Sequence, residues 1–502
     1  MKIPRALVIG LAALLMLATP AGAQTWTPLT HQPSFHASTA LLLTDGTVMV
    51  HQSDGSVAGS TGNWWRLKPD NTGSYINGTW SQLASMPFGY TPLFFASAVL
   101  ADGRVVVEGG EYNGTAFGGG ETSMGAIYDP STNSWTSISP PPGWSHIGDA
   151  QSVVLGNGTF MLGNCGFTGS ICTPNQFQQA LLTASNLTWS ITGTNKADQN
   201  SEEGWTLLPG DPSGPNYPNN GKVLTVDVWN GTQSELYDPN TGSWSSAGST
   251  GVALVACNEI GPAVLRPDGT VFVTGATGNT AIYNSNPFST GWRAGPIFPP
   301  GLGVPDGPAA LLPNGKVLVQ AGPNNPCYSA GSKFYEFDGT TLTHVADPPR
   351  ASVDPSFVGR MLVLPTGQIL FTDYSQDVEV YTPSGTYNFV WQPTINSYPG
   401  NITLGASWYQ ITGTQLNGLS QGAMYGDDAQ SATNYPLVRI TNYTTGHVFY
   451  MFTHSHSSMG VATAGVNVST LFDPPLNMER GWSYLVVVAN GIPSAPVNLN
   501  VN

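Results

Sequence analysis

The chain has 502 residues, a formal net charge of −15 and only 9% charged side chains, and it contains 60 glycines and 40 prolines. Helices need Ala, Leu, Glu and Lys in quantity, so this composition excludes a mainly helical protein and favours an all-β protein rich in turns. The negative charge argues against a nucleic-acid partner, because phosphate binding needs basic patches.

The first 23 residues predict a secretory signal peptide. They begin with Lys2 and Arg5, continue with an apolar run from Ala6 to Leu17, and end on small residues before Gln24. The run is too short for a membrane span, and no later stretch has the length of one. We therefore expect an exported monomer, extracellular or periplasmic, without a membrane span.

One phrase recurs along the rest of the chain: an apolar strand, a turn that ends in Gly, and a second apolar strand. Its first copy is HASTALLLTDGTVMV, from His36 to Val50. Asp-Gly and Asn-Gly supply the positive φ that tight turns demand, so each copy predicts a β-hairpin. The turn glycines are Gly46, Gly103, Gly158, Gly221, Gly269, Gly315 and Gly367. Their spacing of roughly 45–65 residues is typical of propeller blades.

A third strand with a Tyr-Asp-Pro-like ending and a fourth that begins with Trp follow the hairpins, most clearly in AIYDPSTNSWTSIS (Ala126 to Ser139). The last blade has no fourth strand after Tyr381, whereas the mature N-terminus opens with TWTPLTHQPSFH. We expect Trp26 to Leu29 to be that missing outer strand and to close the ring. Residues 24–390 therefore predict a seven-bladed kelch-type β-propeller.

The repeat stops near Trp391. Strands such as GWSYLVVVANGIPSAPVNLNV alternate in polarity up to the C-terminus, so residues 391–502 predict an Ig-like β-sandwich of E-set type.

Four cysteines stand in this exported chain, where disulfides persist. Cys165 and Cys172 close a short loop, which leaves Cys257 and Cys327 to each other. The hairpin count places Cys257 and Cys327 in loops of adjacent blades on one face, which favours this pairing over the other two connectivities. The disulfides either stiffen a functional rim or staple long loops.

In a four-stranded blade, the loop that enters the inner strand lies on the same face as the loop between strands two and three. Counting back from each turn locates the residues at this face, which we call the channel mouth. They are His36, Phe94, Phe95, His146, Asp149, Glu202, Glu203, Trp205, Glu259, Asp306 and Asp354.

Clustered carboxylates in a chain that is sparing with charge have three uses. Two of them can act as acid and base, or acid and nucleophile, on a glycosidic bond. They can also coordinate Ca²⁺, which prefers oxygen ligands. The third use is structural, with acids that cap backbone amides and hydrate the channel. Trp205 beside Glu202 and Glu203 is either a platform for a sugar ring or a packing residue.

Two histidines fall within the segment Thr453-His454-Ser455-His456, at the end of an apolar strand in the C-terminal region. His454 and His456 are candidate metal ligands, although two ligands do not specify a metal. The other interpretation is a pair of surface histidines with hydroxyl neighbours.

HASTALLLTDGTVMV and FASAVLADGRVVVEGG (Phe95 to Gly110), with the N-terminal closure and the C-terminal sandwich, resemble the galactose oxidase and glyoxal oxidase family. In that family the C-terminal domain sends a loop with a copper-binding His, in a Thr-His context, towards the channel. The resemblance therefore implies that His454 approaches the propeller channel.

Other copper ligands of the family have no counterpart here. Phe94 stands where the hairpin alignment puts the family's copper-binding Tyr, and the cysteines are expected to be paired. His36-Ala37 and Val358 stand where an adjacent Tyr-His pair would be required. We therefore expect no Tyr-Cys copper radical, and a divalent metal, Ca²⁺ or Cu²⁺, is the cofactor to test.

The sequence supports three functional hypotheses. The first is an exported hydrolase or lyase that acts on a glycan or similar polymer, with sugar contacts from Trp205, His36 and Asp354. Its catalytic candidates are Asp149, Glu202, Glu203, Glu259, Asp306, His146 and His454. The second is a non-catalytic module that binds carbohydrate or protein through the same mouth, and the third is a copper-dependent oxidase with an atypical site.

Overall fold

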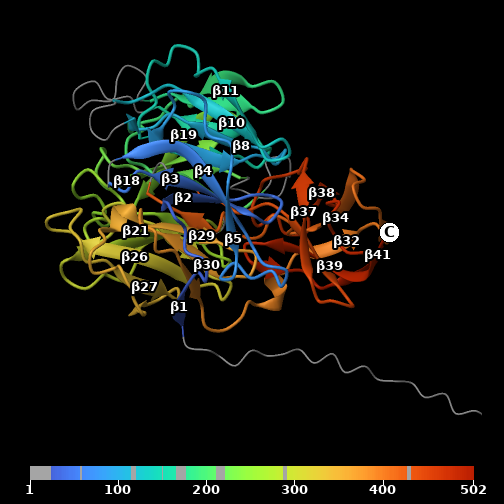
Figure 1. Ribbon diagram of the computed structural model, residues 1–502. Helices are drawn as coiled ribbons and strands as arrows, with labels where there is room; N and C mark the ends of the chain where they lie inside the picture. Colours follow the sequence, from blue (N-terminus) through green and yellow to red (C-terminus); the bar gives the residue numbers. More distant parts are fainter. Residues whose placement is uncertain are drawn as a thin grey trace, which may run out of the picture.

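The protein folds into a β-propeller with a second set of strands at its side (Figure 1). This computed structural model describes residues 24–56, 59–114, 120–149, 151–164, 177–210, 221–286, 291–426 and 431–502. The expected signal peptide and the pair Cys165 and Cys172 lie outside the described residues. Seven antiparallel sheets form the blades, so the predicted seven-bladed propeller is confirmed.

Each blade contributes one inner strand, and most inner strands contact their neighbours around the ring. The inner strands are β2 (His36–Leu42), β7 (Ala96–Val99), β12 (Ser152–Val154), β16 (Thr206–Leu207), β20 (Ala263–Leu265), β25 (Ala309–Leu311) and β29 (Arg360–Val363). The second strands are β3 (Val48–Ser53), β8 (Val105–Glu108), β13 (Phe160–Gly163), β17 (Val223–Val226), β21 (Thr270–Thr274), β26 (Val317–Pro323) and β30 (Ile369–Thr372). Each of the seven predicted turn glycines has a positive φ, for example 75° at Gly46, as a tight hairpin requires.

Third and outer strands complete the blades. The third strands are β4 (Ser60–Lys68), β10 (Gly125–Asp129), β14 (Gln179–Thr183), β18 (Gln233–Asp238), β22 (Thr280–Asn284), β27 (Lys333–Phe337) and β31 (Glu379–Thr382). The outer strands are β5 (Thr79–Gln82), β11 (Ser134–Ile138), β15 (Thr188–Thr192), β19 (Ser243–Ser249), β23 (Gly291–Ala294), β28 (Leu342–His344) and β1 (Thr25–Pro28). Two short additions are β6 (Pro92–Leu93), paired with β9 (Tyr112–Asn113), and β24 (Leu302–Gly303), paired with β26.

The N-terminal strand closes the ring, as predicted. Strand β1 pairs antiparallel with β31, and Trp26 lies opposite Tyr381. The Trp26 ring packs against Tyr381, Phe334 and Phe371 at centroid distances of 4.9, 5.1 and 5.5 Å. The first and last parts of the propeller thus hold each other in place.

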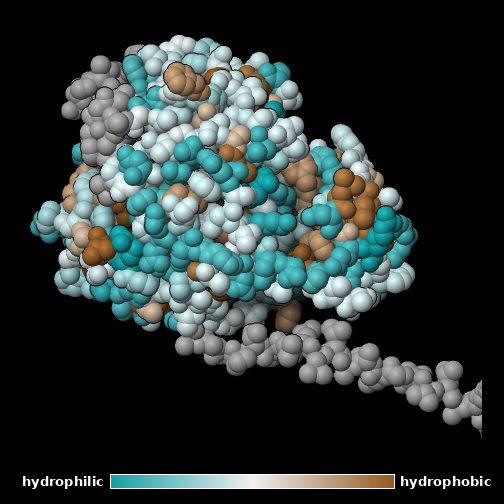
Figure 2. All heavy atoms as spheres, viewed as in Figure 1, coloured by the Kyte–Doolittle hydropathy of each residue, from teal (hydrophilic) through white to brown (hydrophobic). Residues whose placement is uncertain are grey.

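The C-terminal strands form a curled sheet, in agreement with the predicted sandwich. They are β32 (Thr394–Ser397), β33 (Asn401–Ile402), β34 (Tyr409–Thr414), β36 (Leu437–Asn442), β37 (Val448–His454), β38 (Asn467–Asp473), β39 (Gly481–Ala489), β40 (Ile492–Pro493) and β41 (Val497–Val501). The expected domain boundary at residue 391 stays a prediction, since the first of these strands begins at Thr394. Hydrophilic residues cover most of the face in Figure 2, and a group of hydrophobic atoms lies over these strands.

Helical structure is confined to two 3-10 turns, η1 (Ser356–Val358) and η2 (Phe389–Trp391), within the described residues. A helix with the length and hydrophobicity needed to cross a membrane is not found there.

The described parts of the segment between β34 and β36, residues 415–426 and 431–436, contact inner strands of the propeller, and we call these residues the channel segment. Its short strand β35 (Ala423–Met424) extends the sheet of blade six by pairing with β25. Gln421 Oε1 accepts a hydrogen bond from Leu207 N in blade four (2.7 Å), and Ser431 Oγ donates to Ala40 O in blade one (3.1 Å). The channel segment therefore contacts inner strands of blades one, four and six.

Candidate active site at the channel mouth

Three residues at the channel mouth have a left-handed backbone: Phe94, Glu202 and Asp306. Phe94 (φ 49°) and Asp306 (φ 59°) occupy the same place in their repeats, just before the apolar strand of the hairpin. An L-residue rarely adopts this conformation, and such strain tends to concentrate at functional sites. Phe94 lies 6.2 Å from the Tyr112 ring, and Asp306 lies against Gly426 at the tip of the channel segment.

Carboxyl groups from three blades lie near Tyr112. Its hydroxyl donates a hydrogen bond of 2.6 Å to Glu111 Oε1. Burial, this hydrogen bond and the negative fields of Glu111, Asp149 and Glu202 raise the pKa of Tyr112 above its ordinary value. Glu111, Asp149 and Glu202 thus lie within electrostatic reach of one phenol, although they are far apart in sequence.

A second group of carboxyl groups lies near Tyr328. Its hydroxyl donates to Glu259 Oε1 at 2.5 Å. The pKa of Tyr328 is raised, first by burial and then by the negative charges of Glu259, Asp306 and Glu202. The charge of Glu202 acts on both tyrosines, so this residue is common to the two groups of acids.

Arg360 is the first residue of the inner strand of blade seven, β29. It is 2% exposed, and its guanidinium stacks 3.8 Å from the Tyr425 ring of the channel segment. Nη1 donates to Phe357 O (2.7 Å), and the Tyr425 hydroxyl donates to the same carbonyl (2.6 Å). Arg360 and Tyr425 therefore join the inner strand of blade seven to the channel segment.

The disulfide between Cys257 and Cys327 is confirmed. It precedes Tyr328 directly, and the Tyr328 hydroxyl also approaches Cys257 O at 3.3 Å. Glu259 follows two residues after Cys257. The cross-link therefore holds both members of the Tyr328–Glu259 pair at the rim.

His36 and Asp354 lie at the blade-seven side of the mouth and have structural partners. The His36 Nδ1 atom is 3.0 Å from Tyr374 O. Arg350 bridges Asp354 and Asp373 at 3.2 Å each. Burial and the neighbouring Asp373 raise the pKa of Asp354 to about 7. Their sugar-binding roles stay predictions.

Two neighbours of Glu202 do not reach an open surface. Glu203 is fully buried, and its Oε1 accepts a hydrogen bond of 2.7 Å from Lys196 Nζ. Trp205 is also fully buried and packs 5.8 Å from the Trp244 ring. The expectation that Trp205 offers a platform to sugar is wrong, because no face of its ring is accessible, and Glu203 cannot meet a polymer from this position.

The two C-terminal histidines do not join the mouth. His454 Nε2 lies 3.5 Å from Asp473 Oδ2, in a groove of about 270 Å³ that Asp102 and Arg104 also line. Asp102 and Arg104 flank a hairpin turn, which is the opposite end of the blade from Phe94. The implied approach of His454 to the channel is therefore wrong, and the channel segment with Tyr425 takes that place.

His456 and His146 are also separate from the acidic group. His456 is buried with its Nδ1 2.8 Å from Thr470 Oγ1, and burial lowers its pKa to about 3. Among the described residues, neither His454 nor His456 belongs to a group of three possible metal ligands. His146 is exposed on the segment before Asp149, and its ring contacts Ser145 Oγ at 3.0 Å.

The sequence reasoning missed Tyr112, Tyr328, Arg360 and Tyr425. Tyr328 could have been found, because it follows a cysteine already assigned to the mouth. Arg360 lies within a hairpin copy, where an arginine in an apolar strand is a usable signal. Tyr425 lies outside every repeat, and no local pattern points to it.

Comparisons with known proteins support the fold. No family model matches the chain. A Kelch-like protein, terF, of Aspergillus terreus is 31% identical over 93 residues, which are 18% of this chain and 20% of that protein. Among solved structures, a fungal alcohol oxidase of the AA5 family, in complex with copper, has a TM-score of 0.53 at 15% identity and covers 96% of this chain and 100% of its own. The chain has a galactose-oxidase-like kelch propeller fold.

The copper site of such oxidases does not fit the residues that the structure describes. The ring of Phe94 has no ligand atom, and Ala37, Phe357 and Val358 at the corresponding hairpin starts are apolar. Cys257 and Cys327 are consumed by their disulfide, and His454 lies at the far end of the blade. Copper binding needs imidazole, thiolate or phenolate donors, so this position is unsuited to it.

Proposed function

We propose that the protein is an exported enzyme that acts on an extracellular glycan or a similar polar polymer at the channel mouth. The observation that carries the proposal is the hydrogen bond from the Tyr328 hydroxyl to Glu259 Oε1 (2.5 Å), with Glu202 near enough for its charge to act on the same phenol. Glycosidic bond cleavage uses two carboxyl groups that face one bond, one as acid and one as base or nucleophile. The disulfide at the rim and the N-terminal segment support the proposed export.

The two carboxyl groups have different tasks in this proposal. Glu259 accepts the hydrogen bond from the Tyr328 hydroxyl, which stabilises its charged form and suits a base or nucleophile. Glu202 donates a proton to the leaving oxygen. Both side chains belong to residues that are 9% exposed, which limits the competing water around them.

Sugar contacts come from tyrosine and phenylalanine in place of Trp205. Tyr328 is 40% exposed, and Phe94 and Tyr112 are partly exposed. Aromatic rings with a polar end suit sugars, because one face packs on C–H groups while a hydroxyl forms hydrogen bonds. Asp149 and Asp306 complete the rim as groups that orient sugar hydroxyls.

The test compares turnover with binding. Wild type, Glu202→Gln and Glu259→Gln are incubated with a panel of polysaccharides, and released reducing ends and unsaturated products are measured. We expect each substitution to lower turnover by at least about 100-fold, while affinity for the same polysaccharide changes by less than about fivefold. Glu479→Gln is the matched control, because Glu479 pairs with His447 (2.6 Å) in the C-terminal region.

Three outcomes would contradict the proposal. Full turnover in both variants would exclude these carboxyl groups as the acid/base pair. Binding of a polysaccharide by wild type without product release would establish a non-catalytic binding module. Peroxide formation from alcohols or aldehydes by copper-loaded protein would instead support an oxidase with an atypical site.

A further inference from the structure

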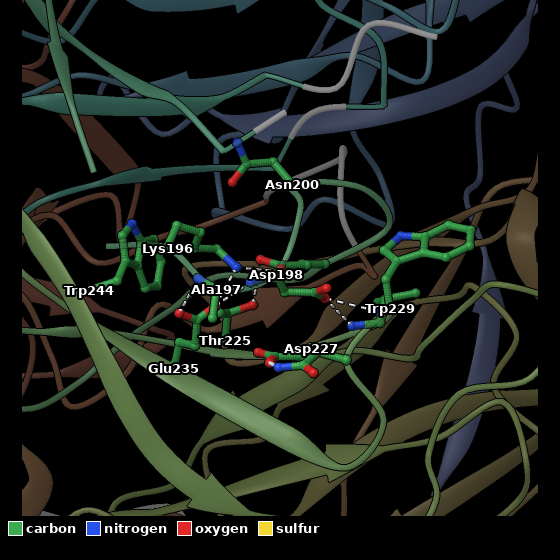
Figure 3. A network of polar contacts seen from close by, with 12 residues as sticks. Lys196, Ala197, Asp198, Asn200, Thr225, Asp227, Trp229, Glu235 and Trp244 are labelled. Atoms are coloured by element: carbon green, nitrogen blue, oxygen red, sulfur yellow. Dashed lines mark hydrogen bonds and ion pairs between the residues drawn. The ribbon is translucent and has the colours of Figure 1, made fainter. Parts of the chain in front are cut away.

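A group of buried acids, Asp198, Glu203 and Asp227, lies in blade four, at the same end of the blade as the mouth. Figure 3 shows the polar network around it. Asp198 and Glu203 come from the segment between β15 and β16, and Asp227 directly follows β17. One carboxylate oxygen of each residue lies within 4.8 Å of the others, and all three residues are buried. Glu235 of β18 lies beside them. Consecutive residues Glu202 and Glu203 thus serve different groups.

The charges of this group are unbalanced. Lys196 Nζ donates to Glu203 Oε1 and Glu235 Oε2 at 2.7 Å each. Asp198 and Asp227 form no ion pair with any described residue. One ammonium therefore faces four carboxyl groups in the interior, and uncompensated buried charge is costly unless protons or a cation neutralise it.

The Asp227 Oδ1 atom is evidence for a ligand that does not depend on the charges of the group. Asp198 Oδ2 accepts hydrogen bonds from Val228 N (2.7 Å) and Trp229 N (2.9 Å). Asp227 Oδ2 accepts one from Asn230 Nδ2 (3.1 Å). Asp227 Oδ1 is buried and has no hydrogen-bond partner, although its residue is 0% exposed. Figure 3 shows the Asp227 side chain directed into the network.

We propose that Asp198, Glu203 and Asp227 bind one calcium-like divalent cation. The donors are oxygen atoms, which Ca²⁺ prefers, and nitrogen or sulfur donors of the kind that select zinc or copper are absent from this group of described residues. Two exposed residues contact the group: Trp229, 42% exposed, donates its backbone N–H to Asp198, and Asn230 donates its side-chain amide to Asp227. The cation ties the segment that carries Glu202 to blade four, which goes beyond the proposed reaction at the mouth.

Protons are the competing way to neutralise the group. Burial is the first cause that raises the pKa of Asp227 to about 7 and that of Glu203 to about 8. If protons neutralise the carboxyl groups, the cluster needs no cation and should not bind Ca²⁺. If the carboxyl groups are charged, it should bind Ca²⁺, so a direct binding measurement distinguishes the two states.

The experiment is calorimetric titration of chelator-treated full-length protein with CaCl₂ at about pH 7.5, followed by Tb³⁺ luminescence sensitised by nearby tryptophans. We expect one Ca²⁺ per chain, displacement of Tb³⁺ by Ca²⁺, and at least about tenfold weaker binding by Asp227→Asn. Asp238→Asn is the matched control in the same blade, because Asp238 caps a turn at Asn240 N (2.9 Å). It should bind like wild type.

The proposal is overturned if wild type binds neither ion, or if Asp227→Asn binds Ca²⁺ as tightly as wild type. Circular dichroism shows whether the variant is folded. If it is not, Asp198→Asn replaces it with the same expectations, because an amide oxygen can still accept the two backbone hydrogen bonds. The readout is binding, so it stays independent of whether the mouth is catalytic.

Discussion

At the scale of single residues, Tyr328 is the group on which the mouth depends. Its hydroxyl contacts Glu259, its charge environment includes Glu202 and Asp306, and the neighbouring disulfide fixes its backbone. Tyr328 can therefore orient the carboxylate base with its hydroxyl and pack on the substrate with its ring.

We predict that Tyr328→Phe lowers kcat by about 10- to 100-fold, because Glu259 loses the hydrogen bond that orients it. The ring remains, so KM should change by less than about threefold. Steady-state kinetics on the active polysaccharide measure both constants. Tyr443→Phe, on an exposed tyrosine of the C-terminal region, is the control. An unchanged kcat in Tyr328→Phe would remove the hydroxyl from the proposed mechanism.

His51 permits a second prediction at this scale. It is fully buried in blade one, its Nε2 donates to Thr61 O (2.7 Å), and burial lowers its pKa from 6.5 to about 4. The unfolded chain therefore binds a proton near pH 6.5 that the folded chain refuses until about pH 4. Stability from this group is complete above pH 6.5 and is lost as the pH falls towards 4.

We expect this linkage to lower the free energy of unfolding of wild type by up to about 3 kcal/mol over that interval. His51→Gln can keep the donor to Thr61 but cannot take up a proton, so its loss over the same interval should be smaller. Urea unfolding at several pH values gives both slopes. Equal slopes would show that His51 does not titrate as described.

At the scale of elements, two long-range pairings hold the architecture together: strand β1 with β31, and the channel segment with the inner strands. Both connect parts of the chain that are distant in sequence. Such pairings contribute stability only after the intervening chain has been ordered.

We predict that Trp26→Ala lowers the free energy of unfolding by about 3 kcal/mol, because three aromatic contacts across the closure are lost. Denaturant unfolding followed by circular dichroism measures the change. Trp482→Ala, at a tryptophan that is 60% exposed, should change it by less than about 1 kcal/mol. Similar effects of the two substitutions would mean that β1 is not a structural closure.

At the scale of the whole molecule, local patterns account for the propeller. Each hairpin contains its own turn signal, such as Asp45-Gly46, between two apolar strands. The blades and their number therefore follow from short stretches of sequence. The closure was predictable because TWTP resembles SWTS at Ser134, a match that needs no knowledge of contacts.

The mouth was predictable only in part. Counting back from turns located Glu202, Glu259 and Asp306, because each lies at a fixed end of a blade. It could not separate Glu202 from Glu203, because Glu202 has a left-handed backbone (φ 60°) that the alternation of a strand does not predict. The channel segment was missed because Gln421 and Tyr425 contact blades that lie far away in sequence. His454 was misplaced because a two-residue match to a family motif is too short to specify position.

A crystal structure of Glu259→Gln with an oligosaccharide released by wild type tests the central claim most directly. The account predicts sugar at the mouth, with one ring on Tyr328 and the scissile bond between Gln at position 259 and Glu202. Sugar bound only in the groove beside His454 and Trp408, with the mouth free of it, would contradict the assignment of the site.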